Sequence, residues 1–357
     1  MSKKIGILTW YFGINYGARA HSMALRESIK SMGFDCEFIN YPSCNNRSIE
    51  LHTCCMTGNL KRHPIILMEG LYKWVKFKKQ LSVYPQSNKV TSAEEIETLG
   101  YDAIVIGSDE ILNLNHDLSS KLYYGVGFKQ EDALVMYAAS AGTVSPDTVL
   151  DLDIRTGLKN MIALSVRDNT SQKLLQNNTG RNVEIVLDPT LLYDFGTGRK
   201  RKYYKNYLLI YSFGALTKEK ERIINFAKAN GLKIVCVGRK CEWADKSYSS
   251  ADLEEWLALY EYASYIVTDS YHGLIFAIKY HKDFILVARG DKTNKIDGLR
   301  DLLNVTRSSL GRDESIEEYL SKSIDYEMIE HAIKKEKEHS MGYLKNGLEK
   351  AIRGDKK

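Results

Sequence analysis

Short apolar runs alternate with longer amphipathic runs along most of the chain. Short runs rich in Ile, Val and Phe are typical of buried strands, and longer runs with apolar residues every three or four positions are typical of helices. The first runs predict a strand at 5–10, a helix at 18–32 that stops at Gly33, and a strand at 34–38. A strand, a helix and a strand within about 40 residues make a βαβ unit, so the predicted sheet is parallel.

The second half of the chain repeats this alternation more regularly. Its predicted strands lie at 207–213, 232–237, 265–268 and 284–288. Thr217 is the expected N-cap of the first helix between them, and Ser249 with Asp252 resembles a capping box before a helix at 253–263. This β-α-β-α-β-α-β series predicts a doubly wound sheet. Further strand candidates in the first half are 101–106, 134–139, 161–166 and 183–187.

The length of the chain and one polar stretch suggest a division into domains. A chain of 357 residues is too long for one ordinary core, so two domains are expected. Residues 194–205 are polar, basic and glycine-containing, which is typical of a linker. We therefore predict an α/β protein with an N-terminal domain at 1–193, a C-terminal domain at 206–310 and C-terminal helices at 311–357.

Composition and charge narrow the class of protein. A hydrophobic content of 44% is ample for globular cores. The net charge of +5, from 50 basic and 45 acidic residues, suits an anionic small molecule or a membrane surface. One basic cluster in the linker is weak evidence for nucleic-acid binding, so we expect no nucleic-acid partner.

The six cysteines and the lengths of the apolar runs bear on metal binding and location. No CxxC pair occurs and no Cys/His spacing resembles a zinc site, so no metal is expected. Cys36 and Cys236 lie in strand-like runs and are predicted to be buried thiols. No signal peptide and no apolar run of spanning length is recognised, so a cytoplasmic location is expected, either in the cytosol or at the inner face of the membrane.

Residues 60–79 mix aliphatic and aromatic residues with basic ones. A basic amphipathic helix of this kind could touch a membrane or a lipid-linked substrate. The alternative is an ordinary surface helix with solvated lysines. Pro64 and Gly70 also weaken the prediction of one long continuous helix.

The stretch 265–278 carries the clearest functional pattern. An apolar strand stops at Asp269, small, polar or flexible residues follow, and an apolar helix-compatible run begins. In open α/β sheets ligands bind at the carboxyl ends of strands, and the first N–H groups of the following helix favour an anion. His272 lies in that turn, where an imidazole can move a proton near neutral pH. The alternative is that His272 caps or packs and that Asp269 forms the turn.

Two further polar turns follow predicted strands. Asp109 could accept a proton from a substrate hydroxyl, or else Ser108 or Asp109 caps a helix. Arg167 could fork onto a carboxylate or phosphate, or else it pairs with Asp168 or another surface acid. The loop at 11–17 is not GxGxxG, so a dinucleotide fingerprint is absent.

Several of these turns belong to an ordered set of short motifs over residues 4–305. The segments are 4–9, Asn15-Tyr16-Gly17-Ala18, 102–113 with Gly107-Ser108-Asp109, Ser140-Ala141-Gly142, Ser165-Val166-Arg167-Asp168, Asp188-Pro189-Thr190 and Thr268-Asp269-Ser270-Tyr271-His272-Gly273. Each motif alone is weakly specific, whereas the ordered set is fairly specific. Together these motifs resemble the polysaccharide pyruvyltransferase family.

The resemblance implies a GT-B-like architecture, in which two Rossmann-like halves flank a cleft, the first serving the acceptor and the second the donor. It implies transfer of pyruvate from phosphoenolpyruvate to a sugar as a ketal, usually in the assembly of bacterial surface polysaccharides. The implied partners are phosphoenolpyruvate, as a co-substrate with no cofactor, and a sugar or oligosaccharide acceptor, free or lipid-linked. Peripheral contact with a membrane is compatible with this activity.

The resemblance also implies roles for individual residues. In the family, an arginine matching Arg167 and the histidine matching His272 are associated with phosphoenolpyruvate. The expected phosphoenolpyruvate contacts are Arg167, Ser270, Tyr271, His272 and Gly273. The expected proton-transfer residues are His272 and Asp109, and the expected acceptor contacts are Asn15, Tyr16 and Asp109.

This chain departs from the family pattern at a few positions, and other functions stay open. Some members carry an arginine where this chain has Ser270, so part of the anion clamp comes from elsewhere or is missing. Glu110 and His21 stand where glutamine is common, and Arg19 stands where an apolar residue is common. The main alternative is a nucleotide-sugar glycosyltransferase on the same architecture, although the acidic residues at 252–255 fit a helix start better than a ribose contact. A non-enzymatic sugar-binding module is the third possibility.

Overall fold

The computed structural model describes residues 3–41, 64–130, 133–199, 204–214, 216–288 and 293–354. The chain forms two compact units. Unit 1 contains Met1–Ile49, Lys79–Asp194 and Lys334–Lys357, and unit 2 contains Glu50–Lys78 and Phe195–Ile333. The long helices α3 (Pro64–Leu81) and α13 (Tyr326–Arg353) therefore each belong in part to both units. The predicted domain boundaries stay a prediction. Residues 200–203 of the predicted linker and 60–63 of the basic stretch lie outside the described residues.

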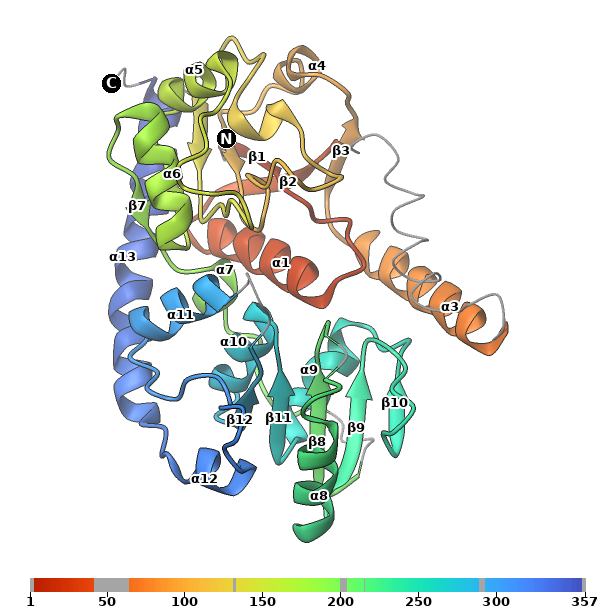
Figure 1. Ribbon diagram of the computed structural model, residues 1–357. Helices are drawn as coiled ribbons and strands as arrows, with labels where there is room; N and C mark the ends of the chain where they lie inside the picture. The colour runs from red at the N-terminus through yellow and green to blue at the C-terminus, as the bar shows by residue number, and fades with distance from the viewer. Residues whose placement is uncertain are drawn as a thin grey trace. The chain divides into compact units, whose positions relative to one another are not determined.

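Unit 1 is built on a parallel sheet with the strand order β3-β2-β1-β4-β5. Figure 1 labels β1, β2 and β3 of this sheet. The strands are β1 (Lys4–Leu8), β2 (Asp35–Asn40), β3 (Gln86–Lys89), β4 (Ala103–Ile106) and β5 (Leu134–Met136). A parallel pair, β6 (Ser165–Val166) and β7 (Glu184–Ile185), continues from β5 through bridges at Ala163 and Val166. The carboxyl ends of β4 to β7 therefore follow one another along one edge.

The elements that connect the strands of unit 1 are mostly short helices. They are α1 (Tyr16–Ser31), α4 (Ala93–Glu97), the 3-10 helix η2 (Lys121–Tyr124), α5 (Leu152–Asn160), α6 (Asn169–Thr179) and α7 (Pro189–Leu192). All four residues of β4 are buried, and so are all but the first of β1. A parallel sheet covered on both faces buries both sides of its strands, and for this reason these strands are continuous apolar runs in the sequence.

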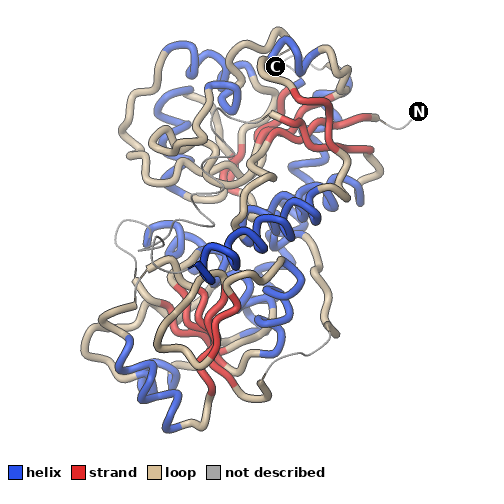
Figure 2. The backbone as a smooth tube through the Cα atoms, turned by 90° about the vertical axis from the view of Figure 1, so that its right-hand side faces the viewer, coloured by secondary structure: helices blue, strands red, loops and turns tan. Residues whose placement is uncertain are grey.

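Unit 2 has a second parallel sheet of the same topology, β10-β9-β8-β11-β12, and Figure 2 shows the strands of each sheet side by side. Its strands are β8 (Tyr207–Tyr211), β9 (Lys233–Val237), β10 (Lys246–Tyr248), β11 (Tyr265–Thr268) and β12 (Asp283–Leu286). Its helices are α8 (Lys220–Ala229), α9 (Leu253–Tyr262), α10 (Tyr271–Lys279), α11 (Thr293–Leu302) and α12 (Ile316–Ser321). One part of its core packs Leu208, Ile210, Ile223, Phe226, Val267 and Ile285 together.

The predicted fold class is confirmed, because both units are parallel α/β sheets of the Rossmann type and a long helix ends the chain. The buried positions of Cys36 and Cys236 are also confirmed. Pro64 does not interrupt the basic helix, since it is the first residue of α3, where proline's missing N–H costs no hydrogen bond. Among the described helices, none combines the length and the apolar character that crossing a bilayer requires.

Two predicted helix caps are wrong. α8 begins after Glu219, which makes no side-chain cap, so Thr217 is not its N-cap. The capping box of α9 is formed by Asp252 and Glu255, whose side chains and backbone N–H groups bond reciprocally. Ser249 instead donates its hydroxyl to Glu69 Oε2 at 2.5 Å. An Asp three residues before a Glu satisfies the same box geometry as Ser, and here it is the Asp that precedes the first helical turn.

Candidate active site

The shared topology of the two sheets locates where a ligand would bind in each unit. In the order 3-2-1-4-5, the chain leaves the first and the fourth strand in opposite directions, and ligands bind at the carboxyl ends of these strands. In unit 1 the switch point lies between β1 and β4, and in unit 2 between β8 and β11. Asn15, Tyr16 and Asp109 follow β1 or β4, residues 270–273 follow β11, and Arg167 follows β6, further along the edge of unit 1.

Polar residues follow the strands of unit 1 along the carboxyl edge. Asp109 follows β4, Ser140 follows β5, Arg167 follows β6 and Asp188 follows β7. The backbone holds this row in register, because Ser140 N donates to Asp109 O at 2.8 Å and Arg167 N donates to Ala139 O at 3.2 Å. Four segments that are distant in the sequence thus bring their polar side chains to one edge of the sheet.

Asp109 occupies the centre of this row. Its φ is 70°, in the left-handed region, which residues other than Gly, Asn and Asp seldom adopt. Its Oδ1 accepts from the Arg167 guanidinium at 3.2 Å, and its Oδ2 lies 3.2 Å from His21 Nε2. The Asp109 side chain is 15% exposed, so part of the carboxylate is still open to solvent. Unusual backbone at a held, partly exposed carboxylate is typical of a functional position.

His21 supports Asp109 from inside the unit. The His21 side chain is fully buried on α1, and its Nδ1 lies 2.9 Å from Ser108 Oγ. An ionised carboxylate can only accept, so Nε2 donates to Asp109, and in a neutral imidazole Nδ1 then accepts from the Ser108 hydroxyl. This is the residue set of a Ser-His-Asp triad, but Ser108 is fully buried. Asp109 is therefore the member that can meet a substrate.

Arg167 is held between two carboxylates. Its side chain is 2% exposed, and it donates to Asp188 Oδ2 at 2.6 Å as well as to Asp109. Asp188 also caps α7 by accepting from the backbone N–H and the hydroxyl of Thr190. Arg167 does not pair with Asp168, which caps α6 and accepts from Ser140 Oγ. The salt-bridge alternative holds in part, because Arg167 pairs with two other acids, although neither is a surface residue. These contacts make Arg167 a residue that orients Asp109, and its binding of a donor stays a prediction.

The first loop of unit 1 supplies the start of α1. Asn15 is the N-cap, and its side-chain oxygen accepts from Gly17 N at 2.9 Å and Ala18 N at 3.4 Å. Tyr16, the first residue of α1, is buried. Tyr11, in the same loop, is buried as well, and burial raises the pKa of its phenol well above its ordinary value, while the positive charge of Arg19 opposes that rise. The proposed acceptor contacts of Asn15 and Tyr16 stay predictions, since capping and packing account for the contacts described.

The alternative in which Ser108 or Asp109 caps a helix is wrong. The described residues after Asp109 form turns, and the next helical element is η2. In the sequence, His21 is a departure from the family pattern with no assigned role. The signal that could have found it is its place on the first helix after β1, beside the topological switch point.

The turn after β11 has the strand–turn–helix form that the sequence predicts. Ser270 is the N-cap of α10, and its Oγ accepts from Gly273 N at 3.3 Å. Gly273 lets the helix start against the strand, because a Cβ at this position would lie 2.0 Å from Thr268 Oγ1. His272 is in the first turn of α10, and its ring meets the Tyr271 ring edge to face, with centroids 5.4 Å apart. Ser270 and His272 thus lie at the N-terminus of a helix, where unpaired backbone N–H groups favour an anion.

Asp269 ties the two loops at the switch point of unit 2 together. Its carboxylate accepts from the backbone N–H groups of Phe213 at 2.8 Å and of Gly214 at 2.6 Å. Arg239, which follows β9, donates to the carbonyls of the same two residues. Asp269 therefore has a structural task beyond forming its own turn.

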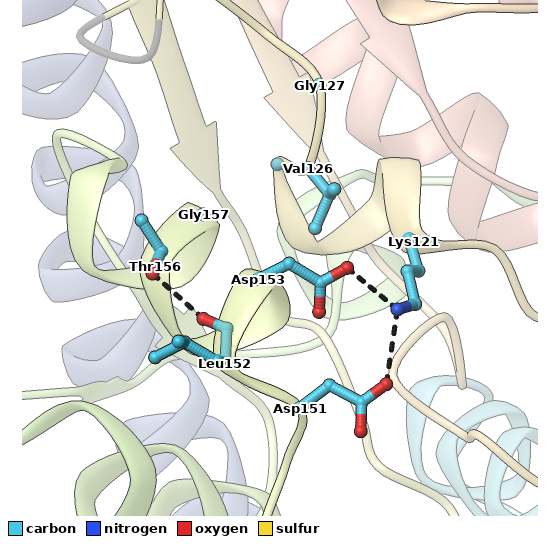
Figure 3. A pocket seen from close by; sticks show the side chains of 9 residues that line it. Lys121, Val126, Gly127, Asp151, Leu152, Asp153, Thr156 and Gly157 are labelled. Atoms are coloured by element: carbon cyan, nitrogen blue, oxygen red, sulfur yellow. Dashed lines mark hydrogen bonds and ion pairs between the residues drawn. The ribbon is translucent and has the colours of Figure 1, made fainter.

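A separate hollow in unit 1 contains none of the predicted site residues. It is lined by Lys121, Gly125, Val126, Gly127, Asp151, Leu152, Asp153, Thr156 and Gly157 (Figure 3). Lys121 Nζ lies 3.1 Å from Asp151 and 2.7 Å from Asp153, which pair with its charge. Within the described residues, no three His, Cys, Asp or Glu side chains gather in a way that could hold a metal ion.

A comparison of the sequence with known families decides the identity of the chain. The family model described as polysaccharide pyruvyl transferase matches residues 15–291, which is most of the chain. The chain belongs to the polysaccharide pyruvyl transferase family. The matched region includes both switch-point loops from Asn15 onward, the Asp109 cluster and the turn at His272. This pyruvyl transferase is thus a member of an enzyme family, and no curated protein matches its sequence.

Solved structures support the fold of this pyruvyl transferase. One is a protein assigned as a UDP-N-acetylglucosamine 2-epimerase from Listeria monocytogenes, with a TM-score of 0.50 and 9% identity, covering 94% of this chain and 91% of that one. Another is the glycotransferase of kitacinnamycin, with a TM-score of 0.50 and 12% identity, covering 97% of both chains. At these identities the likeness shows the fold alone, which is GT-B-like in both comparisons.

Proposed function

We propose that this pyruvyl transferase takes its pyruvyl group from phosphoenolpyruvate and places it as a ketal on two hydroxyls of a sugar, in the synthesis of a surface polysaccharide. The observation that carries the proposal is the Asp109 carboxylate. It is partly exposed at the carboxyl edge of a Rossmann-type sheet, and His21 and Arg167 hold it in place. A positioned carboxylate is the kind of group that can deprotonate an acceptor hydroxyl.

The chemistry of the donor defines what the site must supply. Protonation of the methylene carbon of phosphoenolpyruvate makes its C2 electrophilic. One sugar hydroxyl attacks C2, a second hydroxyl closes the ketal, and inorganic phosphate leaves. The two hydroxyls lose two protons. The methylene carbon takes up one proton, and the departing phosphate takes up the other. The site therefore needs donors for a carboxylate and a phosphate, one acid, and a base for the hydroxyls.

Unit 1 is assigned to the acceptor. Asp109 is the proposed base, and Asn15 and Tyr16 are proposed acceptor contacts on the neighbouring loop. His21 fixes one carboxylate oxygen, and Arg167 fixes the other. Because Arg167 also binds Asp188, we propose that it acts mainly by holding the Asp109 carboxylate in position. A direct contact of Arg167 with the donor remains part of the proposal, as the family resemblance implies.

Unit 2 is assigned to the donor. The N–H groups of the turn from Ser270 to Gly273 and the positive end of the α10 dipole suit a phosphate or a carboxylate. His272 is the proposed phosphate contact and proton donor. Ser270 stands where some members have an arginine, and its hydroxyl caps the helix instead. Arg239 is connected to this turn through hydrogen bonds: it donates to the backbone of 213–214, which in turn donates to Asp269. We propose that Arg239 supplies part of the positive charge.

The runner-up, a nucleotide-sugar glycosyltransferase, lacks a supporting observation of its own. The acidic residues considered for ribose binding have other tasks. Asp252 and Glu255 form the capping box of α9, and Glu255 also pairs with Lys76 at 2.7 Å. The fold, which glycosyltransferases share, does not decide between the two reactions.

Thermal unfolding tests the donor directly. Phosphoenolpyruvate at about 100 times its Kd should add about 2.7 kcal/mol to the free energy of unfolding, because it binds the folded state. For domains of 150–250 residues this corresponds to a rise in Tm of roughly 5–10 °C. UDP-sugars at the same concentration should leave Tm unchanged. Stabilisation by a UDP-sugar without stabilisation by phosphoenolpyruvate would favour the glycosyltransferase.

A further inference from the structure

Helix α3 turns an apolar face outward. Five of its large apolar side chains are between 48% and 70% exposed: Leu67, Met68, Leu71, Tyr72 and Val75. Leu67, Leu71 and Val75 follow one another at four-residue steps, and Met68 and Tyr72 do the same, so all five share one helix face. We call these five residues the outward face. Scattered exposed apolar residues are ordinary, but a contiguous stripe on one helix marks an interaction surface.

The opposite face of α3 packs on unit 2. Lys73 Nζ donates to Gly238 O at 3.2 Å, Lys76 Nζ pairs with Glu255 at 2.7 Å, and Glu69 accepts from Ser249. Phe77, on this same face, is fully buried. Glu69, Lys73 and Lys76 thus anchor the helix to unit 2, while the five residues of the outward face point to solvent. An ordinary surface helix turns one apolar stripe to the core, whereas α3 has a second apolar stripe that faces solvent.

The charges around the outward face identify the partner. α3 carries four lysines and a single acidic residue, Glu69, which points inward. Lys78 and Lys79 lie three and four residues after Val75, so they extend the outward face at its C-terminal end. Trp74 borders the outward face on one side, and Lys76, whose ammonium reaches Glu255, borders it on the other. An apolar stripe with basic and aromatic borders fits the interface of an anionic bilayer, where apolar side chains enter the acyl boundary and lysines meet lipid phosphates.

We propose that the outward face of α3 docks the protein on an anionic phospholipid bilayer. No membrane-spanning segment is needed, because a helix lying in the interface is held by its buried apolar area and by attraction to the lipid charge. Each lysine near an anionic surface is worth about fivefold in binding. The proposal does not depend on the reaction, since none of these side chains is assigned to acceptor or donor.

Co-sedimentation with lipid vesicles tests the proposal on the full chain. We expect wild-type protein to bind vesicles of phosphatidylcholine and phosphatidylglycerol, and to bind pure phosphatidylcholine vesicles at least about tenfold more weakly. The variant M68E/L71E should lose at least about tenfold in binding to the anionic vesicles, because two carboxylates would enter the acyl boundary. Its circular dichroism and its turnover of a soluble acceptor should match those of the wild type.

The matched control is V149E/L152E, which makes the same chemical change at two positions of unit 1 that are 79% and 71% exposed. It should keep vesicle binding within about twofold. Equal binding of both vesicle types, equal losses in the two double variants, or no binding by the wild type would overturn the proposal. So would a wild-type dimer in light scattering that M68E/L71E converts to a monomer, because the outward face would then bind a second copy.

Discussion

Replacing Asp109 with Asn is expected to lower kcat for ketal formation by about 10²–10⁴-fold, the usual contribution of a general base. The Asn side chain has the same shape, and its amide oxygen can still accept from Arg167 or from His21. It cannot take a proton from a sugar hydroxyl. We therefore expect Tm to change by little while turnover is lost, as measured by phosphate release and by mass spectrometry of the glycan.

The matched control is Asp102→Asn, which removes one negative charge from the other end of β4. Asp102 accepts from Lys3 Nζ and from Lys4 N, both at 2.8 Å, and it is distant in the sheet from the carboxyl edge. This variant should turn over at nearly the wild-type rate. If Asp109→Asn kept wild-type kcat, Asp109 would be a structural residue and the assignment of the base would be wrong.

Replacing His272 with Ala is expected to remove both turnover and the response to the donor. The imidazole is assigned to the phosphate and to proton transfer, so kcat should fall by about 10²–10⁴-fold. The rise in Tm with phosphoenolpyruvate should shrink as well, because a contact to the phosphate is lost. Ser270 caps α10, so the alternative that remains for His272 is packing. Loss of both signals separates a donor-binding role from packing, in which Tm itself falls and any remaining folded protein still responds to the donor.

His281→Ala is the control for this variant. His281 is in unit 2 beyond the C-terminal end of α10, stacks on Tyr326 with centroids 4.6 Å apart and pairs with Glu330 at 2.8 Å. Its removal should leave kcat and the donor response intact. A His272→Ala protein with normal turnover would take the imidazole out of the mechanism.

The helices and strands were predictable where the local sequence preference and the tertiary packing favour the same structure. The five residues of β8 are all buried in the middle of a parallel sheet, and such a strand must be a continuous apolar run. The turn after β11 was predictable for the same reason. Ser270 is a good N-cap, and Gly273 is the residue that a close approach to Thr268 requires. Here the short-range signal and the long-range packing coincide.

The partners of Asp109 were not predictable, because they depend on which strands become neighbours. His21 is 88 positions and Arg167 is 58 positions away in the sequence, and the strand order alone brings them together. The left-handed backbone at Asp109 has no clear local signal, since Asp tolerates it without demanding it. The same limit explains why the sequence placed Arg167 on the donor and did not find its ion pair with Asp188, a residue 21 positions further on.

Mass spectrometry of candidate glycans incubated with isotopically labelled phosphoenolpyruvate tests the central claim most directly. The account predicts that a glycan with two neighbouring hydroxyls gains one labelled pyruvyl group in the presence of wild-type protein, with one phosphate released for each ketal formed. With the Asp109→Asn protein the glycan should gain the label about 10²–10⁴-fold more slowly. A glycan that gains a sugar from a nucleotide-sugar donor, and no label from phosphoenolpyruvate, would contradict it.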